Sequence, residues 1–108
     1  MARNTALAFK DERSVPRDEI HYRARGRRAD GSPLALLIVN ISAMGLMARC
    51  EEPVAEGEQI SVIMPRLGPL QAEVRWSLGG RIGCELAETI GLADYYELLA
   101  ALLKTGQR

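Results

Sequence analysis

The sequence predicts a mainly β fold, namely a small six-stranded antiparallel barrel followed by a C-terminal helix. Six short runs with strand-like patterning are separated by turns rich in glycine and proline. Closing such strands into a barrel removes exposed sheet edges, which favours a barrel over an open sheet. Only the last segment changes to a helical period. A chain of 108 residues is long enough for one domain with a modest core.

The first three predicted strands precede the middle of the chain. Residues 20–27 alternate imperfectly between polar and apolar side chains, and the Asp30-Gly31 pair that follows them is typical of a tight turn. Residues 34–41 are the most apolar run in the sequence and form the predicted central strand. Residues 45–50 then form its hairpin partner or a near neighbour.

The other three strands are predicted at residues 59–64, 70–76 and 81–86. In the second of these the alternation is clean, because apolar residues occupy every other position. This places Trp76 on the apolar face and Arg75 on the opposite face. The pattern therefore favours core packing for Trp76.

The closing segment is predicted to be a helix whose leucines cover a mouth or a flank of the barrel. Asp94 lies near its start and Lys104 near its end, where the helix dipole favours these charges, and Gly106 is a stop signal. The apolar residues at helical spacing are Leu92, Tyr95, Tyr96, Leu99, Leu102 and Leu103. Residues 1–10 are expected to be a flexible tail, and residues 11–106 a single domain.

Charge and cysteine usage restrict the classes of function. Fourteen basic residues balance fourteen acidic ones, so indiscriminate binding to nucleic acid or to an anionic membrane is not expected. Nearly all the basic residues are arginine, which suits bidentate contact with a phosphate or a purine edge. Cys50 and Cys84 stand far apart, without the spacing of a zinc site. They are expected to be buried thiols in a reducing compartment, although a disulfide stays open.

The sequence gives no sign of catalysis, of a metal or of a membrane anchor. The single histidine, His21, lies within the first predicted strand without a nucleophile at a recognisable spacing. The carboxylates lie in turns or beside arginines, where no apolar setting raises a pKa for acid–base chemistry. No apolar run is long enough for a signal peptide or a membrane span. A cytoplasmic binding domain without a cofactor is therefore predicted, rather than an enzyme.

Two polar clusters are the candidates for ligand binding. Asn40 and Ser42 occupy alternate positions at the end of the central strand, which places them on one face, and Gly45 allows a positive φ or a close approach. The alternative is a hairpin corner in which Asn and Ser satisfy local backbone groups. Arg13 and Arg17 lie four apart in a non-helical segment and can converge on one object. The alternative for them is a solvated arm paired with nearby acids.

Together, these clusters resemble the paired signature of PilZ domains. Arg13-x-x-x-Arg17 matches that family's R-x-x-x-R motif, and Asn40-x-Ser42-x-x-Gly45 matches its D/N-x-S-x-x-G motif, in the right order. The segments at 74–76 and 81–86 also resemble the closing strands of the family. The resemblance extends from about Lys10 to the final helix. It implies a stand-alone PilZ domain, a six-stranded split barrel that serves bacteria as a receptor for cyclic di-GMP.

The resemblance also implies a role for each motif residue. Arg13 and Arg17 would meet the guanine edges and phosphates of the messenger, while Asn40 and Ser42 would hydrogen-bond a guanine. Gly45 would allow the messenger to approach the backbone closely.

Two positions depart from the common family pattern, and two more positions are possible contacts. Asn40 stands where many members have Asp, and it offers an amide in place of a carboxylate. Glu12 stands where many members have a further arginine, which removes one possible contact. Arg75 is a further candidate for a phosphate contact, and Trp76 is a candidate for stacking on a base.

The function predicted from these observations is that of a cyclic di-GMP receptor. Binding would order the arginine arm and change a surface that an unidentified protein partner recognises. The alternative is an interaction adaptor of the same fold that does not bind the nucleotide, although the retained motifs argue against it. An oligonucleotide-binding barrel would need exposed aromatic side chains, and the chain has few aromatic residues and no net charge.

Overall fold

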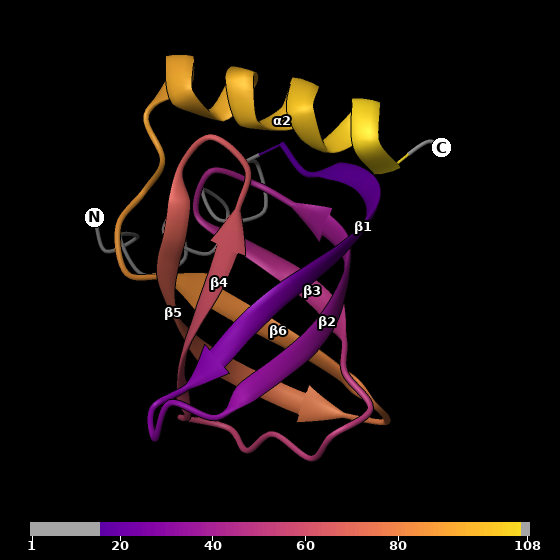
Figure 1. Cartoon of the computed structure of the whole chain (residues 1–108), viewed down its shortest axis with the longest axis vertical. Helices are drawn as coiled ribbons and strands as arrows, with labels where there is room; N and C mark the ends of the chain where they lie inside the picture. Colours follow the sequence, from indigo (N-terminus) through magenta and orange to yellow (C-terminus); the bar gives the residue numbers. More distant parts are fainter. Residues whose placement is uncertain (1–15, 107–108) are drawn as a thin grey trace, which may run out of the picture.

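The structure is a computed structural model, and it describes residues 16–106. Its elements are β1 (Asp18–Arg28), β2 (Pro33–Ile41), β3 (Gly45–Arg49), β4 (Gln59–Met64), β5 (Gly68–Leu78), β6 (Arg81–Leu86) and α2 (Leu92–Gly106). All adjacent strands pair antiparallel in the order β1-β2-β3-β6-β5-β4, and β4 pairs back with β1 to close the barrel (Figure 1). The predicted six-stranded barrel with a C-terminal helix is therefore confirmed. The predicted tail and Arg13 lie outside the described residues.

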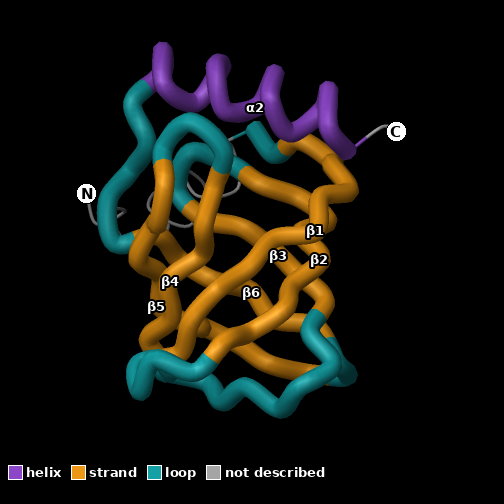
Figure 2. Tube along the Cα trace, viewed as in Figure 1, coloured by secondary structure: helices purple, strands orange, loops and turns teal. Residues whose placement is uncertain are grey.

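The core fills the interior of the barrel and the space beneath the helix. Side chains that point inward from the strands are almost completely buried, among them Ile38, Val62 and Val74. The helix α2 lies across one end of the barrel, above the strands in Figure 2. No helix within residues 16–106 is long and apolar enough to cross a membrane.

The helix packs with a stripe that differs from the predicted one. Its buried side chains are Tyr95, Leu98 and Leu102, at the i, i+3, i+7 spacing of a single helix face. Leu98 was absent from the predicted set although it is completely buried. Leu92 and Tyr96 belonged to that set but are exposed, since they lie on other faces of the helix.

A single hydroxyl group ties α2 to two strands. The Tyr95 hydroxyl donates to the Asp18 carboxylate at 2.7 Å, and it also lies 3.0 Å from the backbone carbonyl oxygen of Ile41. Burial and the neighbouring carboxylate both raise the pKa of Tyr95, so the hydroxyl keeps its proton. The helix is thus joined to the start of β1 and to the end of β2.

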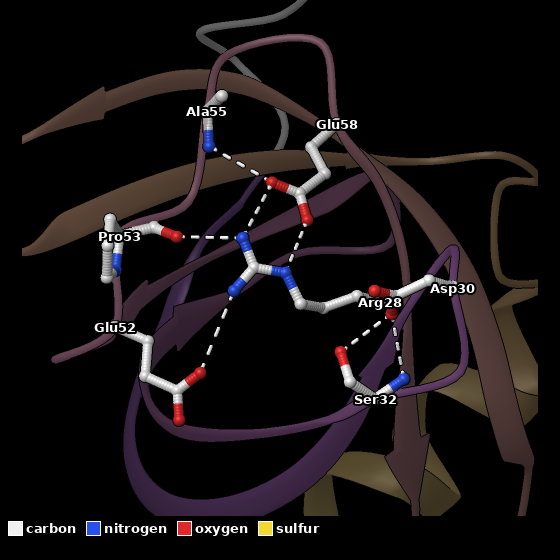
Figure 3. A network of polar contacts seen from close by, with 7 residues as sticks. All are labelled: Arg28, Asp30, Ser32, Glu52, Pro53, Ala55 and Glu58. Carbon is white, nitrogen blue, oxygen red and sulfur yellow. Dashed lines mark hydrogen bonds and ion pairs between the residues drawn. The ribbon is translucent and has the colours of Figure 1, made fainter.

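A second polar network, at the end of the barrel opposite α2, holds a loop in place (Figure 3). The Arg28 guanidinium donates to both carboxylate oxygens of Glu58, at 2.8 and 3.2 Å, and to the carbonyl oxygen of Pro53 at 2.8 Å. Glu52 lies 3.7 Å from the same group. The Glu58 carboxylate also accepts from the backbone N–H of Ala55. Arg28 therefore fastens the loop before β4 to the end of β1.

This network predicts a pH dependence of stability. The hydrogen bonds from Arg28 and from the Ala55 N–H hold the pKa of Glu58 below its ordinary value. The stabilisation from Glu58 is therefore complete above its unfolded pKa of about 4.3 and is lost as the pH falls through the lower folded value. We expect wild type to lose more thermal stability than Glu58→Gln on acidification below about pH 4. Circular dichroism melting of both proteins measures this, and parallel curves would contradict it.

Candidate functional site

A hollow on the outer surface of the barrel collects most of the predicted site residues. It has a volume of about 370 Å³, which lies in the size range of small-molecule sites. Its lining residues are Arg17, Asn40, Ser42, Met44, Gly45, Leu46, Met47, Arg75, Trp76, Gly83, Cys84 and Glu85. Every site residue predicted from the sequence is among them, except Arg13, which lies outside the described residues.

The floor of the hollow follows a row of paired residues across four strands. Asn40 of β2 lies opposite Met47 of β3, which lies opposite Gly83 of β6, which in turn lies opposite Trp76 of β5. Paired residues in adjacent strands share a face of the sheet. The polar side chain of Asn40 and the aromatic side chain of Trp76 therefore stand at the ends of the row, with Met47 and Gly83 between them.

Two irregularities in strand pairing bring the ends of this row to the outside. The register shifts between Ile38 and Asn40 in β2, and again between Val74 and Trp76 in β5. Ile38 and Val74 point into the core, so strict alternation would bury the residue two positions later as well. An extra residue in one strand reverses the side on which the following side chains lie. Both shifts thus carry a candidate site residue to the outer face.

The predicted core packing of Trp76 is therefore wrong. Its side chain is 40% exposed and lines the hollow. The shift in β5 sets the indole over Gly83, where an added Cβ would collide with the indole nitrogen Nε1 and with Cε2. Gly83 was not among the predicted site residues, although a glycine within a strand often marks such a close approach. Met47 was missed as well, and no feature of the sequence marks it.

Replacing Gly83 by alanine is expected to displace the indole. The half-exposed ring can swing outward more easily than the β6 backbone can move. Since Trp76 is the only tryptophan, its fluorescence should shift to longer wavelength while the barrel stays folded. Fluorescence emission together with circular dichroism measures both effects. An unchanged emission maximum in a folded variant would contradict the arrangement.

Ser42 acts first as a local structural residue. Its side chain is 7% exposed, and its hydroxyl oxygen accepts from the backbone N–H groups of Met44 at 3.1 Å and of Gly45 at 3.2 Å. The Ser42 N–H also donates to the Gly45 carbonyl at 2.8 Å. The interpretation as a hairpin corner is thus confirmed for Ser42. Because β2 ends at Ile41, Ser42 and Asn40 line the hollow without sharing a strand face.

Gly45 makes a close approach, but to another strand. Its φ is not positive, and an added Cβ would lie 2.5 Å from the backbone oxygen of Cys84 in β6. The glycine therefore lets β3 and β6 pair tightly at the edge of the hollow. This requirement exists whether or not a ligand is present.

The two arginines of the hollow differ in whether a carboxylate already neutralises them. Arg17 is exposed and forms no ion pair with the other described residues. Arg75 already holds the Glu85 carboxylate at 2.7 Å and lies 4.0 Å from Glu73. Glu85 itself lines the hollow and was missed from the sequence. An anionic ligand that uses Arg75 must therefore compete with a resident carboxylate.

The two cysteines behave as the sequence suggested. Cys50 and Cys84 are free and buried. Burial raises the pKa of the Cys84 thiol to about 12 and also raises that of Cys50, so both are neutral small side chains at pH 7. Within the part of the chain that the structure describes, no group of His, Cys, Asp and Glu side chains could hold a metal ion.

The barrel with its C-terminal helix is similar to solved structures of PilZ domains. No family model and no curated protein matches the sequence. The PilZ domain of CeSA from a cellulose-synthesizing bacterium superposes with a TM-score of 0.59 at 12% identity, over 83% of this chain and 97% of that domain. The PilZ domain of YcgR from Escherichia coli, solved with c-di-GMP, gives a TM-score of 0.59 at 20% identity, over 88% and 93%.

The chain has the fold of a PilZ domain. It also matches the structure of Escherichia coli YcgR in complex with c-di-GMP, with a TM-score of 0.58 at 18% identity. That match covers 87% of this chain but 46% of YcgR, so the PilZ barrel here corresponds to one part of the longer protein. Identities this low establish the fold alone.

Proposed function

We propose that this PilZ barrel is a receptor for cyclic di-GMP. The observation that carries the proposal is the gathering of Arg17, Asn40, Ser42, Arg75 and Trp76 around one hollow of ligand size. These residues come from three separate segments of the chain, and two strand irregularities are needed to assemble them. The likeness to a PilZ domain solved with c-di-GMP supports the choice of ligand.

The chemistry of the lining suits a cyclic dinucleotide with two guanines and two phosphates. The Arg17 guanidinium can form a bidentate contact with a guanine edge or a phosphate. The half-exposed Trp76 ring offers a face for base stacking. Asn40 places an amide at the other end of the row. This amide is available to a ligand, because its Nδ2 makes only a 3.8 Å contact with the Met47 sulfur. Ser42 and Gly45 fix the turn that shapes the rim.

Transmission of the signal would begin at the arm. Arg17 immediately precedes β1, so a ligand that engages it also fixes the start of the first strand. Arg13 would join Arg17 on the ligand and draw the arm against the barrel. The reordered surface would then be recognised by a protein partner. With two free thiols, the protein would act in a reducing compartment, the cytoplasm.

The ion pair between Arg75 and Glu85 favours a second candidate, an adaptor of the same fold that binds no nucleotide. Glu85 brings a negative charge to the hollow and satisfies Arg75 without a ligand. In an adaptor this pair would be purely structural. In a receptor it would open on binding, so the direct test is the titration itself.

Calorimetric titration of cyclic di-GMP tests the proposal. We expect wild type to bind with a dissociation constant of about 1 μM or tighter, and to release the nucleotide chemically unchanged, since no catalytic group is proposed. Arg17→Ala should weaken binding by about 10- to 100-fold, because one bidentate contact is worth roughly 1–3 kcal/mol.

Arg66→Ala is the matched control, because Arg66 is an exposed arginine that does not line this hollow. It should bind like wild type. No heat of binding for folded wild-type protein would reject the receptor and leave the adaptor. Equal loss in both variants would indicate a general charge effect instead of a site.

A further inference from the structure

Three arginines form a strip along the outer face of β1, away from the hollow. Arg23, Arg25 and Arg27 occupy alternate positions of this strand and are all exposed, and none of them lines the hollow. Side chains at alternate positions of a strand share a face and are about 6.6–6.8 Å apart. We call these three residues the arginine strip.

The residues paired with the arginine strip on the adjacent strands are uncharged. On β2, the residues opposite Arg23, Arg25 and Arg27 are Leu37, Ala35 and Pro33, in that order. On β4, Ser61 lies opposite Arg27, and Gln71 of β5 lies beyond it. The strand on either side of the strip therefore supplies no carboxylate to it at these paired positions.

Nor are the three charges neutralised elsewhere within residues 16–106. The ion pairs among these residues involve Arg28 and Arg75, and none involves the strip. Arg27 donates to the backbone carbonyl of Gly31, a neutral acceptor. Asp30, in the turn beyond Arg27, accepts from Ser32 instead. Three like charges on one strand face repel one another, so the strip is a site that an anionic partner would stabilise.

We propose that the arginine strip binds an extended protein segment that carries Asp or Glu at three alternate positions. An extended chain places alternate side chains at the same spacing of about 6.6–6.8 Å, so each carboxylate can face one guanidinium. The planar fork of arginine matches a carboxylate with two parallel hydrogen bonds, which a lysine could not form. The segment lies across the barrel surface, because the closed barrel leaves no strand edge for it to extend.

Other polyanions fit the strip less well. Single-stranded nucleic acid needs aromatic side chains for stacking, and none of the residues paired with the strip is aromatic. Double-stranded nucleic acid favours strongly basic domains, whereas this chain has equal numbers of basic and acidic residues. A membrane surface requires several large exposed apolar side chains beside the charges, and on the strands that pair with β1 the only such side chain is Ile63 of β4.

The test uses two fluorescent seven-residue peptides of serine and glutamate. In one peptide the three glutamates alternate with serine, and in the other they are contiguous. Fluorescence anisotropy at low salt should show binding of wild type to the alternating peptide, at least several-fold tighter than to the contiguous one. Arg25→Gln should weaken binding by about tenfold, and Arg25→Glu should abolish it.

Arg66→Gln is the matched control, since it removes one exposed arginine from the turn between β4 and β5. It should bind both peptides like wild type. Cyclic di-GMP titration of the Arg25 variants should also match wild type, which separates this site from the nucleotide hollow. Equal affinity for the two peptides, no binding at all, or tighter binding to a single-stranded oligonucleotide or to anionic phosphatidylserine vesicles would overturn the proposal.

Discussion

Replacing Gly45 by alanine is expected to destabilise the protein by about 1–3 kcal/mol and to disrupt the hollow. The added Cβ would lie 2.5 Å from the backbone oxygen of Cys84, and a backbone atom cannot rotate away as a side chain can. Relief of the clash requires β3 to separate from β6 at the pair formed by Gly45 and Glu85. The turn that Ser42 holds together would move with it. Thermal melting and cyclic di-GMP titration measure the two consequences.

Gly91→Ala is the control for this prediction. No atom outside the adjoining residues lies within 4 Å of a Cβ added at Gly91, and its φ is not positive. Its position just before α2 limits the cost to about 1 kcal/mol or less. If Gly45→Ala melts no lower than Gly91→Ala, then β3 and β6 are not in the tight contact described above.

Leu98→Ala is expected to have the larger effect on stability, about 2–5 kcal/mol. Leu98 is completely buried between α2 and the barrel, so its truncation leaves a cavity that the rigid barrel cannot collapse to fill. The melting temperature should fall by on the order of 10 °C for a domain of this size. Denaturant unfolding at 25 °C measures the free energy directly.

Leu92→Ala provides a matched control on the same helix. Leu92 is 70% exposed, and the same substitution there should change the free energy of unfolding by less than about 0.5 kcal/mol. Comparable losses in the two variants would mean that α2 does not rest on the barrel through the face of Leu98.

The order of the strands and the helix was predictable because each follows from a local pattern. Alternation in residues 70–76 of β5, the turns rich in glycine and proline between the strands, and the helical period after residue 92 were sufficient to locate these elements. The face of Trp76 could not be predicted in this way. It depends on an extra residue accommodated between β5 and β6, and such an irregularity is a property of two paired strands. A single strand, examined alone, shows only its own alternation.

The candidate site was predicted from motif residues, and its surroundings were not. Arg17, Asn40 and Ser42 line one hollow, but the sequence did not indicate that Glu85 would occupy it beside Arg75. Likewise, nothing in the sequence distinguishes Arg28 from the other arginines of β1, yet Arg28 alone among them binds Glu58, in the loop before β4. Which arginines are neutralised depends on contacts between residues that lie 10 or 30 positions apart in the sequence. The amino-acid composition does not reveal such contacts.

The hydroxyl of Tyr95 connects α2 to residues that adjoin the hollow. Asp18 directly follows Arg17, and Ile41 separates Asn40 from Ser42, so the two groups bound by Tyr95 adjoin both sides of the hollow. A displacement of α2 would therefore act on residues that adjoin the hollow. If the hollow binds cyclic di-GMP as proposed, a protein that moves α2 away from the barrel would weaken the binding of the nucleotide. Bound nucleotide would oppose this displacement of α2 by the same free energy. Occupancy of the hollow could thus be sensed at the helix without any contact between the two ligands.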